Sequence, residues 1–184
     1  MISSNYSLFV LTTTLAQVED LHFIVMKKDA TRLKDLCESL DESTLKSLIN
    51  TQTGEVKRTA VHVATGHNGS HQVLLYLCEK GGDVNVRDKD NYAPLHYAAA
   101  SGKLDSLRYL HETAGVDVNS TTKWNATCLH NAVYNNKTEI VKYLLTETSI
   151  DTEVRDVDGE TAGDVARRIG EQEIVELFDK RTRS

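Results

Sequence analysis

The chain has 184 residues, of which 26% are charged and 40% are apolar, an ordinary composition for one soluble globular domain. Its formal net charge of −6 argues against a general nucleic-acid binder, because attraction to phosphates needs a concentrated positive face. The longest apolar stretches, such as residues 23–26, are far too short to cross a bilayer. We therefore expect neither a nucleic-acid partner nor a membrane-embedded segment.

The N-terminal stretch contains an apolar run at residues 8–11 that resembles the core of a signal peptide. No Lys or Arg precedes Lys27, so the positively charged start of such a peptide is missing. We interpret residues 1–16 as an N-terminal extension that covers the apolar edge of the domain behind it.

A four-residue motif recurs at one fixed spacing. It reads Thr59-Ala60-Val61-His62, then Ala93-Pro94-Leu95-His96, then Thr127-Cys128-Leu129-His130, and its histidines lie 34 residues apart. One period further along the chain is Thr161-Ala162-Gly163-Asp164. A period of this length predicts a protein built from stacked repeats.

Within each repeat the pattern predicts a turn, a short helix, a tight turn and a longer helix, most clearly in the third repeat. Pro94 suits the first helical turn, where its missing N–H costs nothing. Leu95 and Ala98 follow at helical spacing, and Gly102 supplies the left-handed backbone that ends the helix. In the fourth repeat Asn136 takes the place of this glycine.

The first repeat is degenerate, and we expect one extra helix in it. Asp20-Leu21-His22-Phe23 resembles the motif, but its histidine precedes His62 by 40 residues. We assign the additional residues to a helix over residues 41–49, with Asp41 as its N-cap. The side chains expected to face inward are Leu45, Leu48 and Ile49.

The motif is similar to the T-P-L-H-x-A signature of the ankyrin-repeat family, and the resemblance covers roughly residues 17–180. It implies an all-α ankyrin-repeat solenoid of about five helix-turn-helix repeats joined by outward β-hairpin-like loops. The expected units are the extension at 1–16, repeat 1 at 17–51 (the N-terminal cap with the helical insertion), repeats 2 to 4 at 52–87, 88–121 and 122–155, and repeat 5 at 156–184 (the C-terminal cap).

The family period is commonly about 33 residues, so three repeats carry one extra residue each. In the second repeat we assign it to the turn between the two helices. In the third and fourth repeats we assign it to positions after the second helix, at 113–116 and 147–150.

Four histidines, at positions 22, 62, 96 and 130, occupy equivalent places and invite a metal or catalytic interpretation. The resemblance implies a structural role instead, in which each histidine is buried and bonds to the motif threonine and to neighbouring backbone. Repeats about 10 Å apart also exclude shared zinc ligation through bonds of about 2 Å, so we expect no metal site. The structural motif residues are Thr59, His62, Pro94, His96, Thr127, His130 and Thr161.

No phosphate-binding, dinucleotide-binding, metalloprotease or nucleophile-elbow motif occurs in the chain. We therefore expect a protein without enzymatic activity, catalytic residues, cofactor or small-molecule substrate. Cys37, Cys78 and Cys128 match no zinc or redox spacing and indicate reduced structural thiols, as in the cytoplasm or the nucleus.

Ankyrin repeats bind other proteins through a concave surface made of the outward loops and the exposed side of each first helix. Transferring these positions to this chain selects Arg58, Lys89, Asp90, Tyr92, Lys123, Trp124, Tyr134, Asn135 and Arg168. Trp124 is the only tryptophan, and Trp and Tyr are enriched at interface hot spots. The alternative is that Trp124 packs on a neighbouring loop and holds the loops together. The basic residues among these positions indicate a partner segment with apolar anchors and acidic character.

The sequence thus predicts a monomeric adaptor, scaffold or inhibitor that binds a protein partner. The alternative is an ankyrin domain of a larger multidomain protein, or a pathogen effector, that serves targeting or self-assembly. Asn85, with Leu77, Asp83 and Val84, also resembles the pattern hydroxylated by the factor-inhibiting asparaginyl hydroxylase. It is a candidate modification site, unless it only stabilises a turn.

Overall fold

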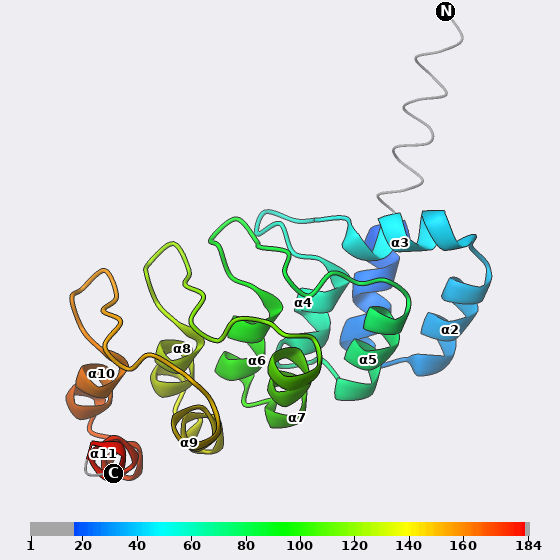
Figure 1. Ribbon diagram of the computed structural model, residues 1–184. Coiled ribbons are helices and arrows are strands. Elements are labelled where there is room, and N and C mark those ends of the chain that lie inside the picture. Colours follow the sequence, from blue (N-terminus) through cyan, green and yellow to red (C-terminus); the bar gives the residue numbers. More distant parts are fainter. Residues whose placement is uncertain (1–16, 183–184) are drawn as a thin grey trace, which may run out of the picture.

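The computed structural model describes residues 17–182, and the extension predicted at residues 1–16 lies outside the described residues. The helices alternate between two rows, with loops projecting from the side of the first row (Figure 1). The first row contains the helix over residues 17–27, α4 (Ala60–Thr65), α6 (Pro94–Ser101), α8 (Cys128–Tyr134) and α10 (Ala162–Ile169). The second row contains α2 (Ala30–Glu38), α5 (His71–Glu79), α7 (Leu104–Arg108) continued by η1 (Tyr109–Thr113), α9 (Thr138–Glu147) and α11 (Gln172–Arg181).

This arrangement is the predicted all-α solenoid of helical pairs. Within residues 17–182 the β pairing is limited to two isolated bridges, Thr53 with Arg58 and Arg155 with Thr161. None of the described helices is long and apolar enough to cross a membrane.

The core is one continuous apolar layer between the two rows of helices. Leu95, Ala98 and Ala99 of α6 are completely buried, and α6 packs against both α4 and α8. Alanine lets neighbouring first-row helices approach closely, while each fully buried leucine contributes roughly 2 kcal/mol through its removal from water. The stack of repeats is therefore held together mainly by apolar side chains.

The first helices end where the sequence predicts. Gly102 and Gly170 adopt left-handed backbone angles after α6 and α10, with φ of 71° and 81°. Asn136 adopts the same conformation after α8, with φ of 51°. Among residues with a side chain, asparagine tolerates this region comparatively well.

The extra helix of the first repeat is α3 (Glu42–Asn50), and Asp41 is its N-cap as expected. The Asp41 carboxylate accepts hydrogen bonds from the Thr44 hydroxyl at 2.6 Å and from the backbone N–H groups of Thr44 and Ser43 at 3.0 and 3.1 Å. These bonds hold the pKa of Asp41 at about 2. The predicted inward side chains Leu45, Leu48 and Ile49 are buried. Figure 1 shows α3 lying across the end of the first helical pair, on the side from which the loops project.

The extra residue of the second repeat lies between its helices, as predicted. Helix α5 begins nine residues after His62, whereas α7 begins eight residues after His96. The longer turn brings Gly69 against the preceding helix, where a Cβ would lie only 1.8 Å from the carbonyl oxygen of Ala64.

The assignment for the third repeat is wrong, because the extra residue lies inside the second helix and not after it. The N–H of Ala114 donates to the carbonyl of Tyr109, five residues back, at 3.0 Å, which makes η1 a π-helical turn. A single π turn absorbs one residue without ending a helix. Leu110 within it and Val116 after it both remain buried. In the fourth repeat α9 ends at Glu147 and the chain becomes extended at Thr148.

Candidate functional site

His62, His96 and His130 each join a first-row helix to the following loop. In each ring Nδ1 accepts a hydrogen bond from the backbone N–H three residues earlier, at 3.1–3.2 Å. Each Nε2 donates to a carbonyl of the next loop, that of Tyr92, Ser120 or Glu160 respectively, at 2.9–3.2 Å. Thr59 and Thr127 also place their hydroxyls 2.9 Å from Nδ1, whereas Ala93 has none to offer His96.

These hydrogen bonds require neutral histidines, because Nδ1 must accept and Nε2 must donate. Burial lowers the pKa of all three rings, and that of His96 falls to about 4. The three side chains therefore have the structural role that the family resemblance implies.

The two end repeats depart from this pattern. In the last one Asp164 replaces the histidine: its Oδ2 accepts from the N–H of Thr161, and its own N–H donates to the Thr161 hydroxyl, both at 3.1 Å. In the first repeat, Nδ1 of His22 instead lies 3.0 Å from the hydroxyl of Thr53, and its Nε2 is buried without a hydrogen-bond partner. The expectation of one shared role for all four histidines is therefore wrong for His22, because this residue lies in the middle of the helix over residues 17–27 and not in its first turn.

Neighbouring loops are connected at their tips by backbone hydrogen bonds. The N–H groups of Lys89, Lys123 and Val157 donate to the carbonyls of Val56, Asp90 and Trp124, each at 3.0 Å. Side-chain amides add bonds between the same loops, such as Asn91 Nδ2 to the carbonyl of Thr121 at 2.7 Å. The loops therefore form one connected row. We call this row, together with the first-row helices, the loop face.

Aromatic side chains gather on the loop face. The ring centroid of Tyr92 lies 5.6 Å from that of Tyr97 and 5.8 Å from that of Trp124. Trp124 is 39% exposed, and Tyr134 on α8 is 43% exposed. Both interpretations of Trp124 thus find support, since its ring contacts Tyr92 while a large part of it remains open to a partner.

A hollow of about 220 Å³ lies beside these rings, lined by Tyr92, Trp124 and Tyr134 together with Asp156 and Asp158. Its remaining lining residues are Ala126, Asn131 and Val157. The hollow thus combines aromatic walls with two carboxylates.

The Asp156 carboxylate is almost buried and held by three hydrogen bonds. Its Oδ2 accepts from the Tyr134 hydroxyl at 2.9 Å, and its Oδ1 accepts from the N–H groups of Asp158 and Glu160 at 3.0 and 3.1 Å. Burial opposes ionisation, but these bonds outweigh it and hold the pKa of Asp156 below its usual value. Burial and the bond to Asp156 raise the pKa of Tyr134 to about 12. At neutral pH the hollow therefore carries negative charge.

Three of the four predicted basic residues, Arg58, Lys123 and Arg168, are engaged by the protein itself. Lys123 pairs with Asp90 and lies 4.5 Å above the Trp124 ring. Arg168 pairs with Glu160 at 2.8 Å. Arg58 lies 5.8 Å from the Tyr97 ring. None of these three cations lines the hollow, so the acidic partner expected from the sequence does not match the charge of the hollow.

Two other predicted residues lie in turns. The exposed Asn135 donates its Nδ2 to the carbonyl of Asn131 at 2.8 Å, within the last turn of α8. Asn85 is exposed in the loop after α5, and its N–H donates to the Asp83 carboxylate at 2.8 Å. Its hydroxylation stays a prediction.

Sequence reasoning missed Phe23 and Met26, which are 47% and 44% exposed. Phe23 lies one residue after His22, as Tyr97 does after His96, and Met26 lies four residues after His22, as Tyr134 does after His130. The motif register would have identified them. Asp88 and Asp156 also occupy equivalent positions, eight residues before His96 and Asp164 respectively. The Oδ2 of Asp88 accepts a hydrogen bond from the Tyr97 hydroxyl at 2.7 Å.

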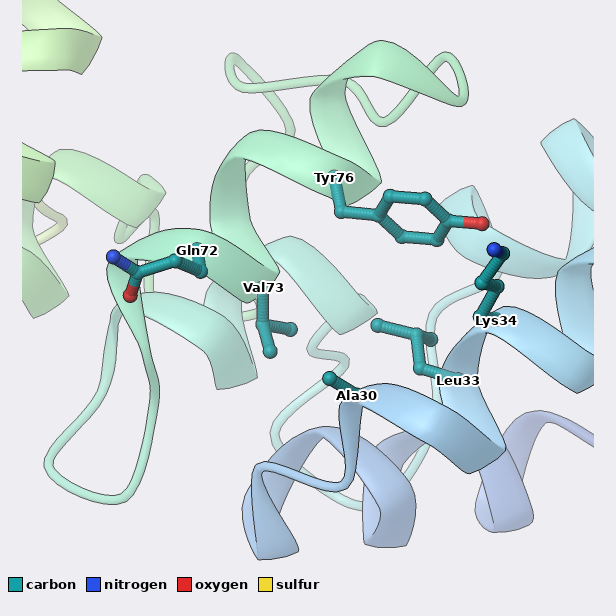
Figure 2. Close-up of a pocket in the computed structure, with 6 residues that line it drawn as sticks. All are labelled: Ala30, Leu33, Lys34, Gln72, Val73 and Tyr76. Atoms are coloured by element: carbon teal, nitrogen blue, oxygen red, sulfur yellow. The ribbon is translucent and has the colours of Figure 1, made fainter.

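A second hollow, of about 250 Å³, lies between α2 and α5 in the second row, away from the loops. Figure 2 shows Leu33 of α2 and Val73 of α5 pointing toward one another across it, with Lys34 and Tyr76 at one side. Lys34 pairs with Glu38 on its own helix. This hollow offers apolar contact without converging charges, so the loop face is the stronger candidate for specific recognition.

Comparison with known proteins agrees with this architecture. A family model described as ankyrin repeat matches residues 57–89, and one described as ankyrin repeats (many copies) matches residues 95–145. The chain is 32% identical over 91 residues to protein phosphatase 1 regulatory subunit 12A of Mus musculus and of Rattus norvegicus, a stretch that covers 50% of the chain and 8% of each relative. It is 53% identical over 38 residues to ankyrin repeat domain-containing protein 49 of Mus musculus, which covers 21% of the chain and 16% of that protein.

Proposed function

Because this chain is an ankyrin-repeat protein, we propose that it is a non-catalytic module that binds a protein partner across its loop face. It would act as an adaptor, a scaffold or an inhibitor. Ankyrin repeats are general protein-interaction modules, which makes the loop face the surface to test first.

The observation that carries this proposal is where the large apolar side chains are exposed. Among the described residues six such side chains are exposed, and all six belong to the loops or to the first-row helices. They are Phe23, Met26, Trp124, Tyr134, Val157 and Ile169. Single exposed apolar residues are normal on any protein, but a set gathered on one face marks an interaction surface.

The connected loops also favour binding, because they hold the recognition residues in place beforehand. Trp124 is fixed on both sides, since its ring contacts Tyr92 and its carbonyl accepts the hydrogen bond from Val157. A surface ordered before association loses little conformational entropy when a partner arrives. Affinity then depends on a few anchors more than on total area.

A second candidate is a targeting or self-assembly module within a larger protein. The chain matches only 8% of the length of protein phosphatase 1 regulatory subunit 12A, so there the similar stretch is a small part of a much longer regulatory subunit. By analogy, the present repeats would direct a larger assembly to its target. The loop face serves this role in the same way.

The test is a comparative capture from lysate of the source cells, followed by reconstitution with the captured protein. The baits are the wild type, Trp124→Ala/Tyr134→Ala, and the control Tyr76→Ala/Tyr109→Ala, which removes two aromatic rings from second-row helices. Circular dichroism first verifies that all three fold equally. We expect a partner held by the wild type and the control, with a Kd at least about 30-fold higher for the loop-face variant, the loss of about one hot spot.

Equal affinity of all three baits for every reconstituted partner contradicts binding across this part of the loop face. Loss of binding in the Tyr76→Ala/Tyr109→Ala control alone moves the site to the second row.

A further inference from the structure

We propose that the hollow between Trp124 and Tyr134 receives a basic side chain, arginine or lysine, of the bound partner. This inference rests on the proposed function and specifies the chemistry of the partner segment. It reverses the acidic character that the sequence alone indicates.

The lining of the hollow is complementary to a positive charge. Asp156 and Asp158 are the two charged residues that line the hollow, and both are acidic. Carboxylate oxygens of Asp156, Asp158 and Glu160 lie within 4.8 Å of one another. The Arg168 guanidinium is paired with Glu160, so it neutralises that carboxylate and not the two that line the hollow. Like charges so close together repel, and a cation placed among them relieves the repulsion.

The walls of the hollow are largely aromatic. Tyr92, Trp124 and Tyr134 supply three rings to the walls of the hollow. A cation within about 6 Å of a ring centroid is attracted by the ring, most strongly by that of Trp. The chain already uses this interaction on the same rings, since Lys123 and Arg168 lie 4.5 and 5.9 Å from the Trp124 and Tyr134 centroids. Because neither cation lines the hollow, its interior is left for a cation from the partner.

The hollow also has the size and the combination of apolar and charged surface that suit a long basic side chain. A volume of about 220 Å³ is several times the roughly 30 Å³ share of one water, which suits a single long side chain. Lysine and arginine combine an aliphatic stem, which packs on apolar walls, with a charged end. The stem would lie along the rings, and the charge would reach Asp158, whose carboxylate is the exposed one.

Trp124 provides a reporter inside the proposed site, because it is the only tryptophan in the chain. The probes are blocked pentapeptides Ser-Gly-X-Gly-Ser in which X is arginine, lysine, norleucine or glutamate. Binding is followed by Trp124 fluorescence and by the NMR signal of its indole N–H. We expect the arginine and lysine peptides to bind with a Kd on the order of 1 mM, and the norleucine and glutamate peptides at least about tenfold more weakly.

Asp158→Asn removes the exposed charge and keeps the backbone N–H that bonds to Asp156. It should weaken the lysine peptide about fivefold, whereas Asp105→Asn, the same change at an exposed position on α7, should leave the Kd within about twofold. Equal binding of lysine and norleucine peptides, preference for glutamate, or no binding of any peptide overturns the inference. A Trp124 response to calcium or magnesium chloride in the absence of a response to the basic peptides also overturns it, in favour of a metal site.

The inference and the proposed function fail in different ways. If a reconstituted partner is lost with Trp124→Ala/Tyr134→Ala but binds Asp158→Asn as well as the wild type, the loop face binds the partner without a basic anchor. If no partner depends on the loop face at all, the proposed function itself is wrong.

Discussion

The buried histidines make the stability of this protein depend on pH, and His96 provides the clearest test. Its ring is neutral in the folded protein, because Nδ1 accepts from the N–H of Ala93 and Nε2 donates to the carbonyl of Ser120. A proton added to Nδ1 would face the Ala93 N–H and break that bond. Burial lowers the pKa of His96 from its ordinary value of 6.5 to about 4.

The sign follows from where protons bind. Between pH 6.5 and about 4 the unfolded chain takes up a proton at this residue and the folded chain does not. The contribution of His96 is therefore fully present above pH 6.5 and is lost as the pH falls through this window. The total loss is about 3 kcal/mol, or about 1.4 kcal/mol per pH unit in the middle of the window. The pKa values of His22, His62 and His130 are lowered as well, so they act in the same direction.

The assay is urea unfolding followed by far-ultraviolet circular dichroism across this pH range, for the wild type and His96→Asn. The variant should be less stable at neutral pH by about 1–3 kcal/mol, because a buried N–H loses its acceptor. Its dependence on pH should be shallower by about 1.4 kcal/mol per pH unit. The exposed His67, changed to Asn, is the control and should keep the wild-type slope. Equal slopes for His96→Asn and the wild type would refute the argument that His96 is held neutral.

Two further predictions concern packing and thiol reactivity. Gly69→Ala should lower the free energy of unfolding in urea by more than about 2 kcal/mol, because the new Cβ meets the Ala64 carbonyl. The control Gly54→Ala has open space around the new Cβ but a φ of 69°, so it should cost only about 1 kcal/mol. Equal losses in the two variants would show that the turn at Gly69 adjusts freely. Burial raises the pKa of Cys128 to about 12, so a thiol reagent at neutral pH should modify it no faster than the native chain unfolds; rapid labelling of folded protein, located by mass spectrometry, would contradict its burial.

The sequence determines the positions of the helices well because single residues impose local requirements. Pro94 can begin a helix but not lie inside it, and Gly102 permits the left-handed turn that ends α6. Asp41 identifies the start of α3 for a similar reason, since its carboxylate caps the first backbone N–H groups. These requirements act over three or four residues, so a single sequence carries them.

The remaining features depend on side chains brought together from different repeats. In the sequence Lys123 has no neighbouring partner, but the fold places it beside Asp90, 33 residues away. The sign of the charge in the hollow depends on Asp156, which Tyr134 reaches across 22 residues. The π turn of η1 likewise depends on keeping Leu110 and Val116 in the core, and the period of the motif does not encode that choice.

The hydrogen bonds between loop tips have a mechanical consequence. Each of three successive gaps, from Val56 to Lys89, from Asp90 to Lys123 and from Trp124 to Val157, is closed by one backbone bond. Fanning the loops apart must break one of these bonds for every gap that widens, whereas tilting the loops together along the row leaves all three intact. The loop row therefore resists spreading more than it resists a concerted tilt. A partner that binds two loops would therefore be opposed by the stiffness of the whole row and not by that of a single loop.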